Sequence, residues 1–297
     1  MSRIKDGDVV FIVNSGLLEQ MINLGAARDV TIPDILPNGE RISVISENFC
    51  RGSYSSINIS DDIAHIASNA FQSADVRKVR WGKGCKVIPP YCFSLSSIKE
   101  IVNIDSVTTI GKEAFAESGI EQFIWPSKCK KVPEGCFDGS ALRTITNLQD
   151  VKKVGKLAFA RTPNITKFTW PAKCKTIPED CFFNSGLTEI ENIENVNCIE
   201  HEAFAYTAIK KIAWPKNCPE IPAYCFRGSK LDDFSGFEHI ACIGERAFWG
   251  VNPSSTLDMS NALIAHIDRG AFAEIDRKKV IFPYYTATEE TEKALKK

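Results

Sequence analysis

The stretch VTTIGKEAFAESGIEQFIWP, Val107 to Pro126, contains every feature of a unit that recurs along most of the chain. Its central phenylalanine belongs to a series whose members are separated by 22, 23 or 24 residues. The series consists of Phe49, Phe71, Phe93, Phe115, Phe137, Phe159, Phe182, Phe204, Phe226, Phe248 and Phe272. A fixed period of roughly 20 to 50 residues is typical of solenoid proteins. We therefore expect each period to form one coil of a continuous stack.

Apolar residues recur at fixed distances after each phenylalanine. After Phe115 they are Ile120, Phe123, Trp125, Cys129 and Val132. Such a short unit cannot bury its own apolar side chains, whereas stacked units bury one another's. Phe123 and Trp125 have the two-residue spacing of side chains on one face of a strand. The pattern predicts an α/β solenoid of about 11–12 coils of 22–23 residues. We expect a parallel β-sheet on its concave face and short helical or 3₁₀ turns, which carry the Ala-Phe segments, on its convex face.

The coils alternate between two types. Tryptophan occurs in every second coil, at Trp81, Trp125, Trp170 and Trp214, and the coils between carry Asn103, Asn147 and Asn192 at the equivalent place. A buried indole needs a slimmer neighbour above and below it to keep the interior close-packed. We interpret the tryptophans as core residues and expect the asparagine side chains to bond backbone groups at the strand ends. A tryptophan row that stacks a ligand is the alternative interpretation.

With these residues in view, the chain resembles the leucine-rich repeat of BspA-type proteins, whose repeats read roughly IxxIxIPxxVxxIGxxAFxxC. The motif IG-x-x-AF returns whole at Ile110–Phe115 and at Ile243–Phe248. The family's Cys three places after Phe is Ser or Thr here, as in Ser118. The resemblance implies a curved leucine-rich repeat solenoid that is used for protein binding. In surface-displayed members it implies adhesion to proteins of a host or a neighbouring cell.

Both ends of the chain depart from the repeat, as terminal units of a solenoid do. We expect an N-terminal cap at 1–28, the solenoid at 29–283 and a C-terminal capping helix or tail at 284–297. In the first cap, Val9–Val13 is predicted as a strand near the first coil, and Gly16–Leu24 as a short helix that ends at a left-handed Gly25. In the second, Thr286–Glu289 reads as a capping box that opens a helix.

Eight of the eleven cysteines fall at two repeat positions. One set stands just before the phenylalanine, where other coils have Ala, and consists of Cys92, Cys136, Cys181 and Cys225. The other set stands where other coils have Ile or Val, and consists of Cys85, Cys129, Cys174 and Cys218. We expect reduced thiols that act as small apolar residues. A bond between neighbouring members of the two sets, such as Cys85 and Cys92, stays open.

The sequence offers little for catalysis or for charged partners. The chain has 36 basic and 37 acidic residues, so no excess of Lys and Arg matches a nucleic acid. Its four histidines have no metal-ligand or triad spacing, and phosphate-binding glycine motifs are absent. We therefore expect no enzyme activity, no cofactor, no metal site and no nucleic-acid partner.

The N-terminal sequence does not read as an export signal. After MSRIKDG, the apolar run Val9–Val13 is shorter than the roughly 7–15 residues that a signal peptide needs. No run in the chain reaches the roughly 20 apolar residues of a membrane span. We expect a cytoplasmic protein without membrane insertion and favour a monomer, with unconventional export to the cell surface as the alternative.

Function in an open solenoid is expected on the outward-facing strand positions. The candidate partner-binding residues are Lys78, Arg80, Glu100, Gln122, Ile124, Thr144, Thr146, Lys167, Thr169, Glu189, Glu191, Lys211 and Asp233. Their mixed polar and apolar chemistry is typical of a protein interface, so we expect a non-enzymatic scaffold for a protein partner. The alternatives are a merely solvated face, a surface or secreted adhesin-like protein, and a carbohydrate or glycoprotein binder that uses Trp249, Tyr284 or Tyr285.

Overall fold

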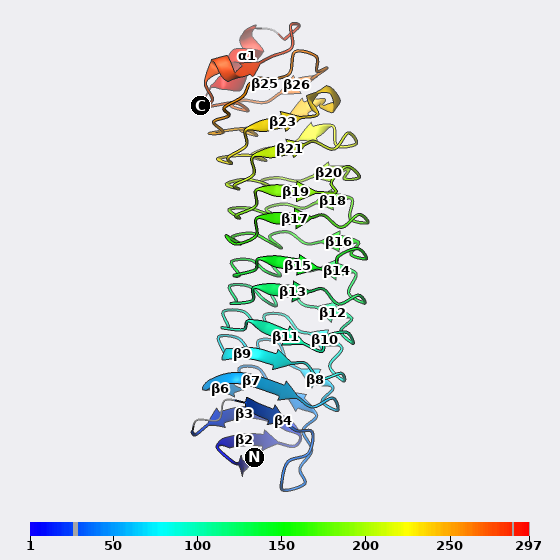
Figure 1. Cartoon of the computed structure of the whole chain (residues 1–297), viewed down its shortest axis with the longest axis vertical. Helices are drawn as coiled ribbons and strands as arrows, with labels where there is room; N and C mark the ends of the chain where they lie inside the picture. The colour runs from blue at the N-terminus through cyan, green and yellow to red at the C-terminus, as the bar shows by residue number, and fades with distance from the viewer. Residues whose placement is uncertain (26–28, 287, 297) are drawn as a thin grey trace. The chain divides into compact units, whose positions relative to one another are not determined.

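The computed structural model describes residues 1–25, 29–286 and 288–296. The chain divides into two compact units, Met1–Leu148 (unit 1) and Gln149–Lys297 (unit 2). In each unit, strands that are one repeat apart in the sequence lie side by side and run parallel (Figure 1). This arrangement confirms the predicted solenoid of parallel coils.

The chain begins with an antiparallel meander of β1 (Ser2–Asp6), β2 (Val9–Asn14) and β3 (Leu17–Asn23). The predicted strand is therefore confirmed, but the predicted helix at Gly16–Leu24 is wrong. The pairing of β2 with β3 shifts register between Ile12 and Val13, where Glu19 is the extra residue of a β-bulge. The bulge lets Leu18 and Met21, three residues apart, both be buried, and this spacing imitated a helix. Gly25 has no left-handed conformation, which occurs instead at Gly16 in the β2–β3 turn.

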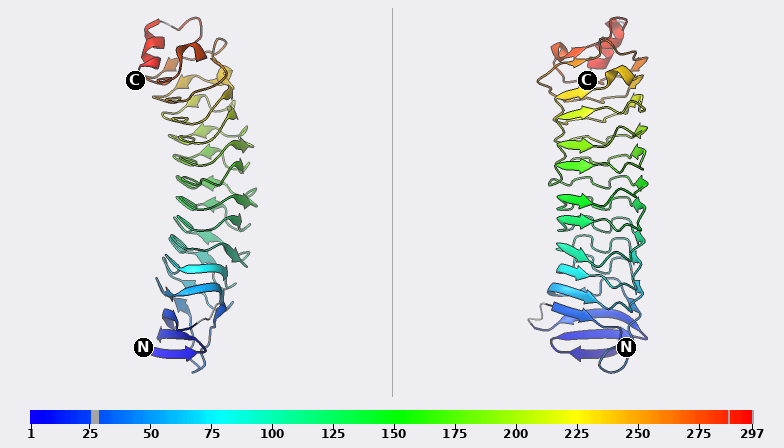
Figure 2. Two further views of the ribbon diagram at one scale, coloured as in Figure 1. Left: turned by 60° about the vertical axis from the view of Figure 1, so that its left-hand side comes forward. Right: turned by 45° about the vertical axis from the view of Figure 1, so that its right-hand side comes forward.

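Each unit has a main ladder of strands (Figure 2). We call the surface formed by the outward-facing side chains of these strands the strand face. In unit 1 the strands of this ladder are β4 (Asp29–Ile32), β7 (Ser53–Ile59), β9 (Asp75–Arg80), β11 (Glu100–Val102), β13 (Gln122–Ile124) and β15 (Thr144–Thr146). In unit 2 they are β17 (Lys167–Thr169), β19 (Glu189–Glu191), β21 (Lys211–Ala213), β23 (Asp233–Ser235), β25 (Leu257–Asp258) and β27 (Val280–Ile281). From β9 to β23, each strand of a tryptophan coil pairs with the strand of the asparagine-type coil that follows it. We call such a pair a doublet.

A second ladder of two-residue strands precedes the Ala-Phe or Cys-Phe segments, and the sequence analysis did not predict it. Its members in unit 1 are β5 (Val44–Ile45), β8 (His65–Ile66), β10 (Val87–Ile88), β12 (Thr109–Ile110) and β14 (Lys131–Val132), and β6 (Cys50–Arg51) pairs nearby with β3. In unit 2 they are β16 (Lys153–Val154), β18 (Thr176–Ile177), β20 (Cys198–Ile199), β22 (Glu220–Ile221), β24 (Cys242–Ile243) and β26 (His266–Ile267). The second residue is buried in almost every one, so each strand adds one apolar side chain to the core.

The phenylalanines form a buried column within each unit. Phe115 stacks on Phe93 with ring centroids 5.4 Å apart and on Phe137 at 5.5 Å. The segment around each phenylalanine is a series of turns closed by i→i+3 hydrogen bonds, such as Ser118 N–H to the Phe115 carbonyl at 3.3 Å. Residues two before and two after the phenylalanine, such as Glu113 and Glu117, both have φ of 52°. Two left-handed residues in each turn prevent a continuous α-helix.

Helical structure in the described residues is short: η1 (Phe237–His239), η2 (Arg277–Lys279) and α1 (Thr288–Leu295). Helix α1 was predicted and closes the phenylalanine column of unit 2. In the coils of unit 2, the amides of the phenylalanines before Phe272 donate to a carbonyl of the next coil, as Phe248 N–H does to Ala271. The last, Phe272, donates instead to the carbonyl of Ala294 in α1 at 2.9 Å. The predicted capping box Thr286–Glu289 includes residue 287, which lies outside the described residues.

Candidate functional site

All thirteen candidate residues lie on the main strands from β9 to β23, with exposed or half-buried side chains. The alternation of a strand explains this placement, because the middle residue points inward and its two neighbours point outward. In β13, for example, Phe123 is 3% exposed whereas Ile124 is 69% exposed. The sequence therefore predicted correctly that these side chains are outward-facing in each unit, but it did not show which of them contact each other.

In three doublets, a lysine on the first strand forms an ion pair with the acidic residue opposite it on the second strand. The pairs and their N–O distances are Lys78–Glu100 at 3.0 Å, Lys167–Glu189 at 2.7 Å and Lys211–Asp233 at 2.7 Å. The hydrogen bond to Glu189 raises the pKa of Lys167 above its usual value. Six candidate residues thus satisfy one another's charge, and opposite charges 22 residues apart in the sequence could have indicated these pairs.

The side chain of Arg80 also bonds to other residues of the chain. Its guanidinium contacts the Asp61 carboxylate at 3.0 Å and donates to the Ile59 carbonyl at 3.2 Å. The Lys83 backbone N–H, followed by the Arg80 guanidinium, lowers the pKa of Asp61. In unit 2, the Thr169 hydroxyl donates to the Glu191 carboxylate at 3.4 Å.

The doublet of β13 and β15 differs from the others because its outward positions carry no charge. Gln122 lies opposite Thr144, and Ile124 lies opposite Thr146. We call these four residues the neutral doublet. At 69% exposure, Ile124 is more exposed than any other large apolar side chain on the described strands. The neutral doublet therefore exposes apolar surface at outward strand positions that carry no ion pair.

Charged residues lie beside the neutral doublet, directly before the strands β11, β13 and β15. The Glu121 carboxylate accepts from Lys99 Nζ at 2.8 Å and lies 3.5 Å from Arg143 Nε. Lys99, and to a smaller extent Arg143, lowers the pKa of Glu121. Sequence analysis missed these three residues because they lie just outside the short strands.

A groove of about 730 Å³ separates β11 from the neutral doublet. Its apolar lining includes Ile101, Val102, Ile104, Ile124 and Pro126. The groove follows from the doublet arrangement, because β11 pairs with the preceding β9 and has no ladder pairing with β13. Apolar side chains on both sides of a groove are typical of binding surfaces.

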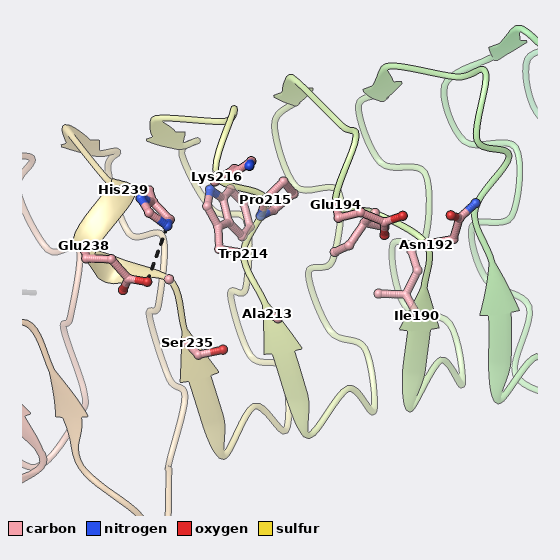
Figure 3. Close-up of a pocket in the computed structure, with 12 residues that line it drawn as sticks. Ile190, Asn192, Glu194, Ala213, Trp214, Pro215, Lys216, Ser235, Glu238 and His239 are labelled. Carbon is pink, nitrogen blue, oxygen red and sulfur yellow. Dashed lines mark ion pairs between the residues drawn. The ribbon is translucent and has the colours of Figure 1, made fainter.

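The same junction in unit 2, between β19 and β21, forms a smaller groove of about 410 Å³. Figure 3 shows its lining, in which Ala213 and Ser235 take the outward strand positions and Glu238 and His239 form an ion pair at 3.4 Å. Gly236, with φ of 107°, stands where other coils have asparagine. Small and charged side chains give this groove less apolar surface than the one beside Ile124.

The tryptophan row is part of the core, as predicted, and the alternative of a ligand-stacking row is excluded by burial. The four indoles are at most 4% exposed. Each indole N–H donates to the carbonyl of the cysteine four residues later, as Trp125 does to Cys129 at 2.9 Å. The asparagine prediction is also confirmed: Asn103, Asn147 and Asn192 donate their side-chain amides to the carbonyls of Trp81, Trp125 and Trp170.

The three aromatic residues considered for sugar binding lie in different settings. Tyr284 is 94% exposed. Tyr285 donates its hydroxyl to the Ala262 carbonyl at 2.8 Å. Trp249 is half-buried beneath the guanidinium of Arg227, at 4.7 Å from the ring centroid.

The eight repeat-position cysteines are all buried, which fits their predicted role as small apolar residues. All eleven cysteines lie in the described part of the chain and are free thiols there. Burial raises the pKa of Cys85 to about 12 and that of Cys129 to about 11. It also raises the pKa of Cys92 and of Cys136 well above the usual value. These thiols stay protonated in the folded protein.

No group of three or more His, Cys, Asp or Glu side chains in residues 1–25, 29–286 and 288–296 could hold a metal ion. None of the helices in these ranges has the length and hydrophobicity to cross a membrane.

The family model of the BspA-type leucine-rich repeat region, which has six copies, matches residues 30–143, 108–232 and 152–279. The chain belongs to the BspA-type leucine-rich repeat family. No curated protein matches this leucine-rich repeat chain in sequence.

Solved leucine-rich repeat proteins are similar to this chain at low sequence identity. One from Bacteroides ovatus is 14% identical with a TM-score of 0.58, over 91% of each chain. The T. pallidum leucine-rich repeat protein is 17% identical with a TM-score of 0.43, over 68% of this chain and 88% of that one. A leucine-rich cell surface protein from Faecalibacterium prausnitzii is 17% identical with a TM-score of 0.38, over 100% of this chain and 98% of that one. The first likeness supports the fold of this BspA-type chain and nothing about its partner.

Proposed function

We propose that the protein is a non-enzymatic interaction module, and that a protein partner docks on the strand face of unit 1 at the neutral doublet. The observation that supports the proposal is the exposure of Ile124 beside the apolar groove, next to a doublet in which Lys78 and Glu100 form an ion pair. A BspA-type repeat array offers such a face as an extended binding surface.

The chemistry of this surface matches the anatomy of a protein interface. Such interfaces have a core depleted of charge and a polar rim. Ile124 with Val102 and the groove supplies the core, and the ion pairs Lys78–Glu100 and Lys99–Glu121 supply the rim. Full burial of one isoleucine side chain contributes about 1.5–3 kcal/mol, which is the size of an interface hot spot.

The remaining candidate residues have a smaller role in this proposal. Lys167, Glu189, Lys211 and Asp233 are engaged with one another in unit 2. Replacing a paired, exposed charge changes the rate of association more than the affinity. We therefore assign affinity to the neutral doublet and place the paired charges at the periphery.

We also propose that the module acts as a monomer in the cytoplasm. Eight buried thiols serve as apolar core residues, and this use of cysteine suits a reducing compartment. Cell fractionation and light scattering on the purified protein test the two statements, and recovery of the protein from the cell surface would favour the adhesin-like alternative.

The test of the docking site is a comparison of two matched substitutions. Ile124→Glu places a charge at the centre of the proposed interface, whereas Leu263→Glu places it on an equally exposed apolar residue elsewhere, Leu263 being 81% exposed. Both variants should fold, because neither side chain is in the core. Quantitative affinity capture from native cells should show loss of the bound proteins with Ile124→Glu alone.

The decisive step uses the partner that this comparison identifies. With the purified pair, Ile124→Glu should weaken binding at least about tenfold, which corresponds to about 1.4 kcal/mol, and Leu263→Glu should leave affinity unchanged. An unchanged set of captured proteins with Ile124→Glu would refute the site.

A further inference from the structure

The turn segments of unit 2 contain two residues that the repeat does not require. The residue after the phenylalanine is Ala, Ser or Cys in six of the eleven coils, as in Ala116, and is larger in the others, as in Phe183. Two consecutive coils instead carry Arg227 and Trp249 there. Because several coils have alanine at this position, the repeat does not require a large side chain there.

Arg227 is held between aromatic rings. Its guanidinium carbon lies 4.7 Å from the ring centroid of Trp249, 5.3 Å from that of Tyr206 and 5.4 Å from that of Tyr224. Three cation–π contacts fix the position of a side chain that would otherwise be mobile. Binding of a ligand to this guanidinium therefore requires little further loss of side-chain entropy, because the side chain is already ordered in the free protein.

A cavity of about 580 Å³ lies beside this guanidinium, which we call the turn pocket. Its lining includes Glu202, Tyr224, Arg227, Trp249 and Glu274. Glycines create the room: Gly228 and Gly250 occupy the repeat position at which the flanking coils have Tyr206 and Glu274. A Cβ at Gly228 would lie 2.7 Å from the Tyr206 ring, so that ring packs directly over the glycine.

The guanidinium of Arg227 is not neutralised by any described residue of the chain. Among the described residues, no carboxylate lies within ion-pair distance of it, and its Nε is buried without a hydrogen-bond partner. Arg246, on the same pocket, differs: it donates to the Tyr224 hydroxyl at 3.1 Å and pairs with Glu245 at 3.4 Å. Arg227 is therefore the cation of the pocket that is left to bind a ligand anion, and carboxylate is the anion that matches its planar fork.

We propose that the turn pocket binds an acidic sugar, a hexuronic or sialic acid residue, whose carboxylate lies on Arg227. The carboxylates of Glu202 and Glu274 then accept hydrogen bonds from the sugar hydroxyls, while Tyr224 and Trp249 contact its apolar face. An acidic sugar has a single carboxylate, which Arg227 binds, whereas an acidic peptide would bring further carboxylates close to Glu202 and Glu274, where like charges repel. This site is independent of the neutral doublet, since it lies on the turns of unit 2 and not on a strand.

The experiment uses the indole N–H signals of the full-length protein labelled with ¹⁵N in tryptophan. The signal of Trp249 is assigned by its absence in Trp249→Phe. The probes are the methyl glycosides of glucuronic acid and of N-acetylneuraminic acid, with methyl glucoside as the neutral sugar and succinate as the carboxylate without a sugar. An acidic pentapeptide tests the competing class of ligand.

We expect saturable movement of the Trp249 signal with one or both acidic sugars, and at least tenfold weaker binding of methyl glucoside and succinate. Arg227→Gln should weaken sugar binding at least tenfold, whereas Lys230→Gln, which removes the same charge from an exposed residue outside the pocket, should not. Unaltered signals of the four buried tryptophans verify that each variant is folded. Absence of movement with both acidic sugars, equal binding of succinate, or tighter binding of the peptide would overturn the proposal.

Discussion

The side-chain amide of Asn103 donates to the carbonyl oxygen of Trp81 at 2.6 Å, and the backbone N–H of Trp81 donates to Val102 at 3.0 Å. These bonds join two successive coils, so the structural repeat of the strand face is a doublet of 44 residues rather than a single coil. The doublet explains why grooves form between β11 and β13 and again between β19 and β21.

Asn103 also has φ of 65°, a left-handed conformation in which alanine is strained. Asn103→Ala should lower the free energy of unfolding by about 2 kcal/mol, since it removes a bond to a carbonyl and adds backbone strain. Asn103→Gly should cost only about 1 kcal/mol, because glycine adopts this φ freely, as Gly236 does at the same repeat position. Urea unfolding measures both values, and equal losses would contradict the assigned strain.

Substitution of a phenylalanine of the column should lower the free energy of unfolding much more than substitution of a cysteine beside it. Phe115 is fully buried between Phe93 and Phe137, so Phe115→Ala should cost about 3–5 kcal/mol. Cys136→Ala should cost far less, because other coils carry alanine at that position, for example Ala114. Comparable losses in thermal or urea unfolding would show that the thiols do more than fill space.

The buried thiols predict how stability depends on pH. The pKa of Cys85 rises from 9.0 to about 12 on folding, so the folded protein keeps a proton that the unfolded chain loses. The stabilisation is therefore complete below pH 9 and is lost as the pH rises from about 9 to about 12. Urea unfolding across this range should show a steady fall, and Cys85→Ala should reduce its slope. A flat profile would contradict burial of the thiols.

The N-terminal meander should be needed for solubility. Strand β3 pairs with β5 and β6, so deletion of residues 1–28 uncovers the edge of the first coils and the side chains of Ile45 and Phe49. Light scattering should reveal aggregation of this variant, whereas deletion of residues 1–6 removes only the outer strand β1 and should leave a monomer. A monomeric 1–28 deletion would show that these residues are not a cap.

Sequence alone predicted the coils because Phe115 and its counterparts leave an unmistakable period. It failed where a local feature altered that spacing: the bulge at Glu19 made Leu18 and Met21 look helical. It also missed the second ladder, because strands such as Thr109–Ile110 have only two residues.

For the candidate interface too, the sequence predicts some features and not others. Outward positions such as Lys78 and Ile124 followed from strand alternation, and the Lys78–Glu100 pair could have been read from the 22-residue spacing of opposite charges. The turn pocket could not have been predicted, because it depends on where Gly228 leaves room beside Arg227 in three dimensions.

Site-specific photocrosslinking in the native cell shows whether a protein partner docks at the neutral doublet. The photoreactive residue p-benzoylphenylalanine is placed at Ile124, and at Leu263 as the matched exposed position. We expect a discrete crosslinked protein from position 124 and none from position 263. Crosslinks to the same protein from position 263, with none from position 124, would contradict docking on the strand face at the neutral doublet.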